Sequence, residues 1–395
     1  MLNICQVSLS RDIPIILDNY YSFRKFYKKF KIFVICPNKE IDQFQKKLNF
    51  KEFYFIPEET ILSFEEFDII FEKLSNNIDY KKKFKERLGW YYQQILKLSF
   101  IINFISSKKE NIIIWDADTI ILKKIIFFEN DYSVKYGSLF EFHKPYYKTN
   151  EGMIGKNPEY FISSLVQFIG ITCLECHHLL KNYLKLDKYE NQLSSSISKI
   201  ILQNIFKKHQ IYNGSLFSEY ELIGISNYIL HKKKQKPIFT LRSGLDGKLT
   251  NIQLKIARLV NVKHVTYEHS HLNNLSQGML KRKQSWSRFI KIIFKDLNYA
   301  AFSPIQRLDS GENDETILSS VAFVEDQDLK ETIQDTLILL NRGEIEEAEK
   351  RIDIYSGLFK SLDQLSPEEM IEVTTDNEIK RIPINSPEYM SWVKA

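Results

Sequence analysis

Short apolar runs alternate with segments of helical periodicity along the first part of the chain. Asn3–Ser8 and Lys31–Cys36 are apolar runs that predict buried strands, and Glu52–Ile56 predicts a third. Between them, Asp12–Phe26 has apolar residues at helical spacing, and Glu40–Leu48 predicts another helix. Strands that alternate with helices favour βαβ units and a parallel sheet. We therefore predict an α/β fold with a mostly parallel central sheet.

A long helix and a strongly apolar strand follow. The periodicity predicts a helix over Phe84–Ser106, and Asn111–Trp115 is the most strand-like segment of the chain. This strand stops at Asp116-Ala117-Asp118, and ligands of open α/β sheets bind outside the carboxyl ends of strands. We expect the chemistry there. Further helices are predicted over Glu190–Lys208 and Glu219–His231, and further strands over Pro237–Leu241 and Val262–Tyr267.

Charge divides the chain near Phe302. Residues 303–395 contain 9 Lys and Arg against 21 Asp and Glu, a net charge of −12. Residues 1–302 therefore carry a net charge of +17, and the whole chain carries +5. This shift predicts one domain over 1–302 and an acidic accessory module over 303–395. In the module, Asp328–Leu340 and Ile345–Phe359 predict a helical hairpin, so we expect it to be mainly helical. The sequence gives no indication of its role.

The composition bears on location and partners. We find neither a signal-peptide pattern nor an apolar run of about 18 residues that could span a bilayer. Four cysteines in 395 residues are too few for a disulfide scaffold, so we expect a cytoplasmic protein. The basic first domain suits a polyanionic partner: a nucleotide diphosphate, an anionic membrane face or a nucleic acid. A position peripheral to the inner membrane is compatible with this charge.

Asp116 and Asp118 give the strongest chemical signal. Two carboxylates one residue apart at a strand end can reach one hard divalent cation, directly or through water. Such a cation would bridge the diphosphate oxygens of a nucleotide-sugar and neutralise charge as the sugar leaves. The alternative is a pair of solvated carboxylates in a turn, since Asp-x-Asp also occurs by chance. The position after an apolar strand favours the metal site.

The helix over residues 89–98 carries a second signal. An ordinary amphipathic helix accounts for its apolar residues. It does not account for the paired amides of Gln93 and Gln94 beside Lys97, which can hydrogen-bond a base, a ribose or a phosphate. These three residues are therefore candidates for binding a nucleotide.

Taken together, these motifs resemble a bacterial family of GT-A-type glycosyltransferases catalogued as domain of unknown function 6492. The resemblance is carried by Gly-Trp-Tyr-Tyr-Gln-Gln-x-x-Lys-Leu at residues 89–98, Asp-x-Asp at 116–118 and Ser-Glu-Tyr-Glu-Leu at 218–222. The motifs occur in the family's order, and the resemblance covers about residues 1–300. After Leu222 the chain departs from the family's aromatic-Gly-Asn-Tyr pattern, which leaves the acceptor contacts of that helix unassigned.

The resemblance implies a Rossmann-like GT-A domain that binds a nucleotide-sugar. It implies that Asp116 and Asp118 are the metal-binding pair, and that Gln93, Gln94 and Lys97 lie near the donor. Sugar transferases of this type often complete the metal shell with a late His or Asp. His269 and His271 are our candidates, although exposed loop histidines are an equally good interpretation. Imidazole ligands favour Mn²⁺ over Mg²⁺, and either ion is compatible with the carboxylates.

Three further assignments concern the first strand and the helix after Phe217. Ser8 and Arg11 follow the first strand, where fold analogy places the nucleotide base or ribose. Ser218 and Glu221 have the spacing of a capping box, which gives Glu221 a structural role. Glu219 is then the candidate general base for an acceptor hydroxyl. The alternative for Glu219 is a solvated carboxylate at the helix start, where the helix dipole stabilises it.

The function we predict is a glycosyltransferase. It would move a sugar from a nucleotide-diphosphate donor to a glycan or lipid-linked acceptor in surface polysaccharide synthesis, with Mn²⁺ or Mg²⁺ as cofactor. The alternative is a nucleic-acid-binding protein that uses the basic first domain. That alternative predicts a continuous basic stripe with interleaved aromatic residues, whereas Lys81–Lys83 and Lys232–Lys234 are dispersed. We therefore expect no nucleic-acid partner.

Overall fold

The computed structural model describes most of the first 267 residues and a few segments beyond them. The described residues are 1–76, 78–137, 144–155, 167–186, 192–212, 215–233, 236–238, 240–241, 245, 247–259, 262–267, 284, 289, 370–375 and 378–383. The chain forms two compact units. Unit 1 comprises Met1–Ala117, Ile126–Tyr136 and His143–Gln235, and unit 2 comprises Asp118–Ile125, Gly137–Phe142 and Lys236–Ala395. The predicted boundary at residue 302 lies outside the described residues.

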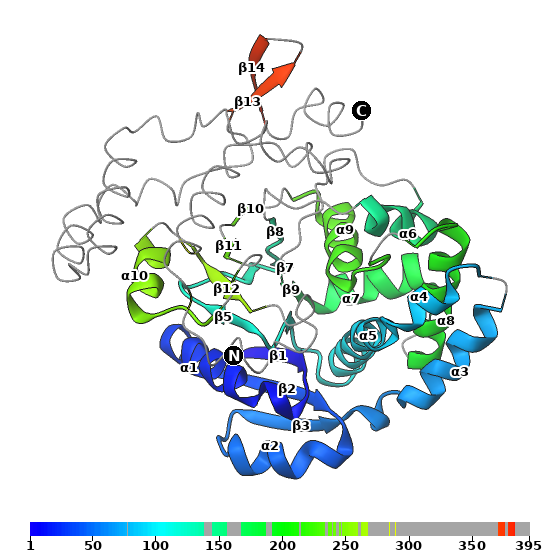
Figure 1. Cartoon of the computed structure of the whole chain (residues 1–395), viewed down its shortest axis with the longest axis horizontal. Helices are drawn as coiled ribbons and strands as arrows, with labels where there is room; N and C mark the ends of the chain where they lie inside the picture. The colour runs from blue at the N-terminus through cyan, green and yellow to red at the C-terminus, as the bar shows by residue number, and fades with distance from the viewer. Residues whose placement is uncertain are drawn as a thin grey trace. The chain divides into compact units, whose positions relative to one another are not determined.

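A five-stranded sheet organises unit 1 (Figure 1). Its order is β3-β2-β1-β4-β9, with bounds Leu2–Val7 (β1), Phe30–Cys36 (β2), Phe53–Pro57 (β3), Ile112–Trp115 (β4) and Phe168–Ile171 (β9). The pairs β1–β2, β2–β3 and β1–β4 are parallel, and β9 is antiparallel to β4. The predicted α/β class with a mostly parallel central sheet is confirmed, whereas β9 was not predicted.

Helices cover both faces of this sheet, because both faces of its strands are apolar. Cys5 and Ile114 belong to the buried core that α5 shares. On the opposite face, Trp115 meets Phe23 of α1 edge to face at 5.1 Å between ring centroids. The helices of unit 1 are Ile13–Phe26 (α1), Ile41–Lys47 (α2), Phe64–Leu74 (α3), Lys81–Lys85 (α4), Leu88–Lys108 (α5), Lys144–Ile154 (α6), Cys173–Leu179 (α7), Leu193–Lys208 (α8) and Glu219–His231 (α9).

These bounds refine the sequence predictions. The single helix predicted over Phe84–Ser106 is two helices, α4 and α5, and α3 and α6 were not predicted. A π-helical turn (Leu180–Leu184) continues α7. The predicted helix Glu219–His231 is found with the same bounds. Among the described residues, none of the helices has both the length and the apolar character needed to cross a membrane.

Unit 2 contains a small sheet in the order β11-β12-β5. β12 (His264–Thr266) is parallel to β11 (Thr240–Leu241) and antiparallel to β5 (Thr119–Ile121), and α10 covers Asn251–Leu259. In the acidic module, β13 (Met370–Thr375) and β14 (Glu378–Pro383) form an antiparallel pair that the sequence did not predict. The helices predicted there lie outside the described residues. The remaining short strands are Phe128–Glu129 (β6), Tyr132–Ser133 (β7), Tyr136–Gly137 (β8) and Lys236–Pro237 (β10).

Three glutamates follow the carboxyl ends of β2 and β3. Burial, followed by the charges of Glu59 and Glu40, raises the pKa of Glu58 from 4.5 to about 7. Between pH 4.5 and about pH 7, the folded chain therefore keeps a proton on Glu58 that the unfolded chain has released. The contribution of Glu58 to stability is fully present below pH 4.5 and is lost as the pH rises through about 7.

Glu58→Gln is accordingly expected to stabilise the protein at alkaline pH. The gain at about pH 8 should be about 1 kcal/mol, because the half-exposed position screens the charge repulsion. The variant should also have a flatter dependence of unfolding free energy on pH, measured by urea denaturation at about pH 5 and about pH 8. Glu65→Gln, at an exposed position of α3, is the control and should retain the wild-type pH dependence. Equal pH dependence in Glu58→Gln and wild type would contradict the prediction.

Candidate active site

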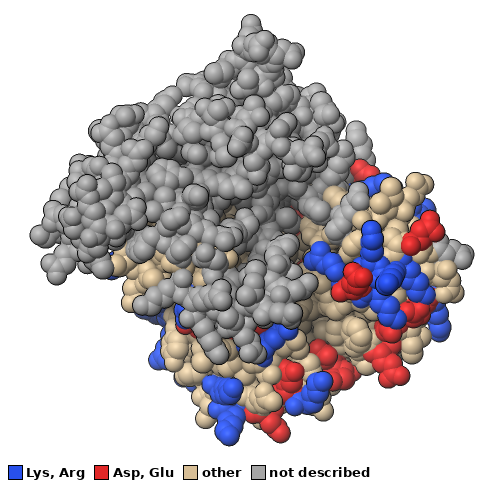
Figure 2. Space-filling view, viewed as in Figure 1, with Lys and Arg blue, Asp and Glu red and all other residues tan. Residues whose placement is uncertain are grey.

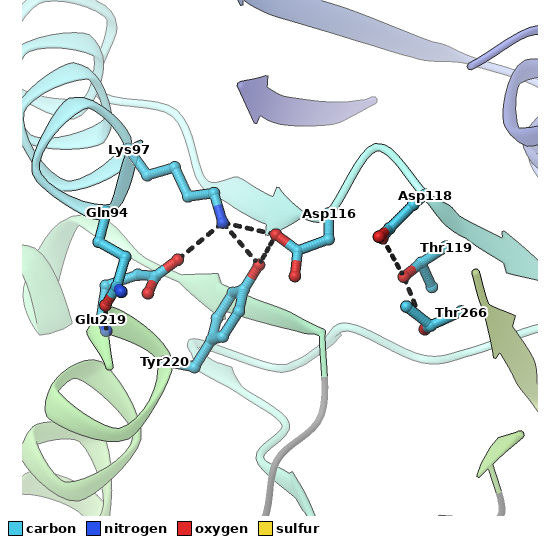
Figure 3. Close-up of polar contacts among 8 residues, drawn as sticks. All are labelled: Gln94, Lys97, Asp116, Asp118, Thr119, Glu219, Tyr220 and Thr266. Atoms are coloured by element: carbon cyan, nitrogen blue, oxygen red, sulfur yellow. Dashed lines mark hydrogen bonds and ion pairs between the residues drawn. The ribbon is translucent and has the colours of Figure 1, made fainter. Parts of the chain in front are cut away.

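A buried lysine joins three side chains at the carboxyl end of β4 (Figure 3). Lys97, on α5, is only 4% exposed. Its Nζ lies 2.5 Å from Asp116 Oδ1, 2.8 Å from Glu219 Oε1 and 3.1 Å from the hydroxyl oxygen of Tyr220. The Tyr220 hydroxyl in turn donates to Asp116 Oδ1 at 2.6 Å. Three residues singled out from the sequence, from α5, the end of β4 and α9, thus meet at one point in unit 1.

Local interactions place each of these groups. The N–H of Asp116 donates to the Gln167 carbonyl at 3.0 Å, which extends the β4–β9 pairing by one residue. Gln94 and Lys97 are three residues apart on α5 and share a face of that helix. Gln94 Oε1 accepts the N–H of Glu219 at 3.1 Å, so the face that carries Lys97 also holds the first turn of α9.

The electrostatics of the cluster keep Lys97 charged. Burial alone lowers the pKa of Lys97, but the nearby charges of Asp116 and Glu219 outweigh it and the pKa lies above its ordinary value. Burial raises the pKa of Glu219 above its ordinary value, and the ammonium group of Lys97 only partly opposes that rise. The geometry places one ammonium group in contact with two carboxyl groups, which is the arrangement that a buried cation requires.

Glu219 is not the solvated carboxylate that the sequence allowed. It is 2% exposed, and Lys97 occupies one of its oxygens. The first half of the predicted capping box is present, since Ser218 Oγ accepts the N–H of Glu221 at 3.5 Å. The carboxylate of Glu221 lies 3.8 Å from Lys135 Nζ, so Glu221 forms an ion pair with Lys135. The role of Glu219 as a general base stays a prediction.

Asp118 is the first residue of unit 2 and leads into β5. Its carbonyl accepts the N–H of Tyr267 at 3.0 Å, and its Oδ1 accepts the Thr119 hydroxyl at 3.4 Å. Thr119 Oγ1 lies 2.8 Å from Thr266 Oγ1 in the pairing of β5 with β12 (Figure 3). The backbone of Asp118 is thus held by the β5–β12 pairing, independently of its carboxylate.

The other predicted residues differ in exposure. Ser8 is buried and donates to Asp12 Oδ2 at 3.1 Å. Arg11 lies in a 3-10 turn (Ser10–Asp12) with its side chain 57% exposed. Gln93 is half-buried. His269 and His271 lie outside the described residues, and no group of three or more His, Cys, Asp or Glu side chains that could hold a metal ion is found within them.

The chemistry of the two aspartates fits a hard divalent cation. Carboxylate oxygens are the ligands that Mg²⁺ and Mn²⁺ take. The side chain of Asp116 is 29% exposed, and the contacts from Lys97 and Tyr220 both go to Oδ1. In the described part of the chain, Oδ2 of Asp116 accepts no hydrogen bond. One oxygen of Asp116 thus fixes the side chain, and the other can serve as a ligand.

The sequence did not assign a role to Tyr220. The residue lies within the quoted Ser-Glu-Tyr-Glu-Leu motif, but only the structure shows that its hydroxyl bonds to both Lys97 and Asp116. Its ring also lies 4.9 Å from Lys97 Nζ, measured to the ring centroid. The sequence signal that could have pointed to Tyr220 is its position next to Glu219. Consecutive residues at a helix start can contact the same side chain, and here both contact Lys97.

Residues 15–159 match the profile of a family described as "Family of unknown function (DUF6492)". The matched range is less than half of the chain and contains Lys97, Asp116 and Asp118, whereas Glu219 lies beyond it. This is the family that the sequence motifs resemble. Among curated proteins, none matches the chain.

Several solved structures are similar to the chain, and those named here are sugar transferases. Mouse xyloside xylosyltransferase 1, in its apo form, is 9% identical with a TM-score of 0.37, over 68% of this chain and 98% of that chain. Galactosyltransferase LgtC, in complex with donor and acceptor sugar analogs, is 12% identical with a TM-score of 0.30, over 52% and 70%. An active-site mutant of LgtC is 10% identical with a TM-score of 0.34, over 74% and 95%. Because all three TM-scores are low, the fold assignment rests on the strand order and directions of this chain.

Proposed function

We propose that this chain is a glycosyltransferase with a GT-A-type domain that uses a nucleotide-diphosphate sugar as donor. The observation that carries the proposal is the carboxylate of Asp116, which lies at the carboxyl end of a parallel strand and is fixed by the buried Lys97. Ligands of open α/β sheets bind at this edge. The family match over residues 15–159 agrees with the motif resemblance that first suggested the function.

Asp116 and Asp118 would hold Mn²⁺ or Mg²⁺ in this proposal. A cation held there supplies Lewis-acid chemistry, since it neutralises charge on the diphosphate as the sugar leaves. Lys97 and Tyr220 fix Oδ1 of Asp116, which orients the other oxygen of that carboxylate. We further propose that Gln93, Ser8 and Arg11 contact the nucleotide, as their positions on α5 and after β1 suggest. His269 and His271 remain our candidates for completing the metal shell.

The acceptor we propose is a glycan or lipid-linked glycan of a surface polysaccharide. A lipid-linked acceptor would bring this cytoplasmic enzyme to the membrane face, where basic side chains favour anionic lipid. Sedimentation with vesicles that contain anionic lipid checks this contact, and no binding at low salt would exclude it. On the face in Figure 2, blue and red side chains are interspersed over the described residues, which does not favour the basic stripe of a nucleic-acid-binding protein.

A thermal titration tests the proposed function. The protein is heated with Mn²⁺ and, in turn, with UDP-linked and GDP-linked sugars. We expect stabilisation that requires both metal and nucleotide-sugar, because a ligand that binds only the folded chain stabilises it by about 2.7 kcal/mol at about 100 times its Kd. Salt-sensitive binding to random RNA or DNA, without any response to nucleotide-sugars, would instead support the nucleic-acid alternative.

A further inference from the structure

The buried cluster around Lys97 holds one more acidic group than its ion pairing needs. Lys97 lies between Asp116 and Glu219, and Tyr220 contributes a neutral hydroxyl. Among the described residues, no other Lys or Arg pairs with either carboxylate. With its three ionisable groups charged, the cluster carries a net charge of −1.

A second buried carboxylate is costly unless something compensates for its charge. Burying an ionised group without a full partner costs several kcal/mol. Asp116 is partly exposed, but Glu219 is almost completely enclosed. The backbone N–H of Glu219 donates a hydrogen bond to the side chain of Gln94. One aspartate would suffice to pair with Lys97. The presence of Glu219 therefore indicates a purpose other than stability.

We propose that Glu219 is a positioning residue that acts through Lys97 to preserve the negative charge of Asp116. An ammonium group bound to Asp116 alone would cancel the charge that attracts a cation to that carboxylate. Glu219 contacts the same ammonium group and offsets it, so that Asp116 keeps its attraction for a divalent cation while Lys97 fixes its Oδ1. This inference rests on the proposed function, since it requires that Asp116 binds the metal.

Glu219→Gln tests the proposal, because it keeps the shape and removes the charge. The affinity for Mn²⁺ is measured without donor, from the electron paramagnetic resonance signal of the free ion. We expect about tenfold weaker binding than in wild type, since the charge of the cluster becomes zero. The double variant Lys97→Met/Glu219→Gln restores the charge of −1 and should recover an affinity within about threefold of wild type. A purely structural role of Glu219 predicts no such recovery.

Controls separate this effect from loss of folding. Glu175→Gln changes another fully buried glutamate, which lies on α7 and accepts hydrogen bonds from the N–H groups of Ser133 and Thr172, and should leave Mn²⁺ affinity unchanged. Thermal melts of each variant verify that it is folded. Equal Mn²⁺ affinity in wild type and Glu219→Gln would overturn the positioning role alone. Absence of any Mn²⁺ or nucleotide-sugar binding in wild type would overturn the proposed function, and this inference with it.

Discussion

Asp118→Ala is expected to abolish metal-dependent binding of the nucleotide-sugar and to lower kcat/KM at least about 10³-fold. A lost ligand removes the charge stabilisation that a bound cation gives to the leaving diphosphate. Folding should be spared, because Asp118 is anchored through its carbonyl to the N–H of Tyr267, and alanine keeps that bond. The measurements are sugar transfer with the donor found by titration, and thermal stability with and without Mn²⁺.

Two companion variants test whether the loss of activity in Asp118→Ala comes from the lost metal ligand. Asp118→Asn keeps an oxygen ligand without the charge and should retain weak, Mn²⁺-dependent activity. Asp131→Ala removes an exposed aspartate from the turn between β6 and β7 and should behave as wild type. If Asp118→Ala transfers sugar at the wild-type rate, Asp118 is not a metal ligand and the proposed mechanism is wrong.

Lys97→Met is expected to destabilise the protein by about 3–5 kcal/mol. Removing one member of a buried ion cluster leaves the other charges without compensation, and here Glu219 is almost completely enclosed. Methionine fills a similar volume, so the loss reports charge rather than packing. Urea unfolding measures the change, and added Mn²⁺ should recover part of the stability by replacing the missing positive charge at Asp116.

A double-mutant cycle isolates this interaction. Lys97→Met/Glu219→Gln removes the ammonium group and the enclosed carboxylate together, and should be more stable than Lys97→Met alone. Lys83→Met, at an exposed position of α4, is the matched control and should change stability by less than about 0.5 kcal/mol. Strictly additive losses in the cycle would show that Lys97 and Glu219 do not interact.

Much of the sheet was predictable because its strands are short, apolar and separated by periodic helices. β1, β2, β3 and β4 were predicted close to their observed bounds. β9 was not predicted. Its four residues, Phe168–Ile171, lie in a longer stretch of apolar and small residues that has neither helical nor strand periodicity. The strand is defined by its antiparallel pairing with β4.

The contacts within the candidate site were less predictable than its members. Lys97 and Asp116 were both named from the sequence, but a pattern in one chain cannot show that they share a bond. Glu219 lies 122 residues from Lys97, and its predicted alternative was exposure to solvent. Neighbouring Gln93 and Gln94 also looked alike in sequence. The turn of α5 buries Gln94 and leaves Gln93 half-buried, so only Gln94 became part of the scaffold.

The order in which the cluster can assemble follows from the separation of its parts along the chain. Lys97 and Asp116 are 19 residues apart, so they can meet as soon as α5 packs on β4. Glu219 and Tyr220 join from a segment more than one hundred residues later, and closing so long a loop is slower than closing a short one. A chain still emerging from the ribosome would therefore hold Asp116 neutralised by Lys97. Its attraction for metal ions would begin only when α9 docks, at the completion of unit 1.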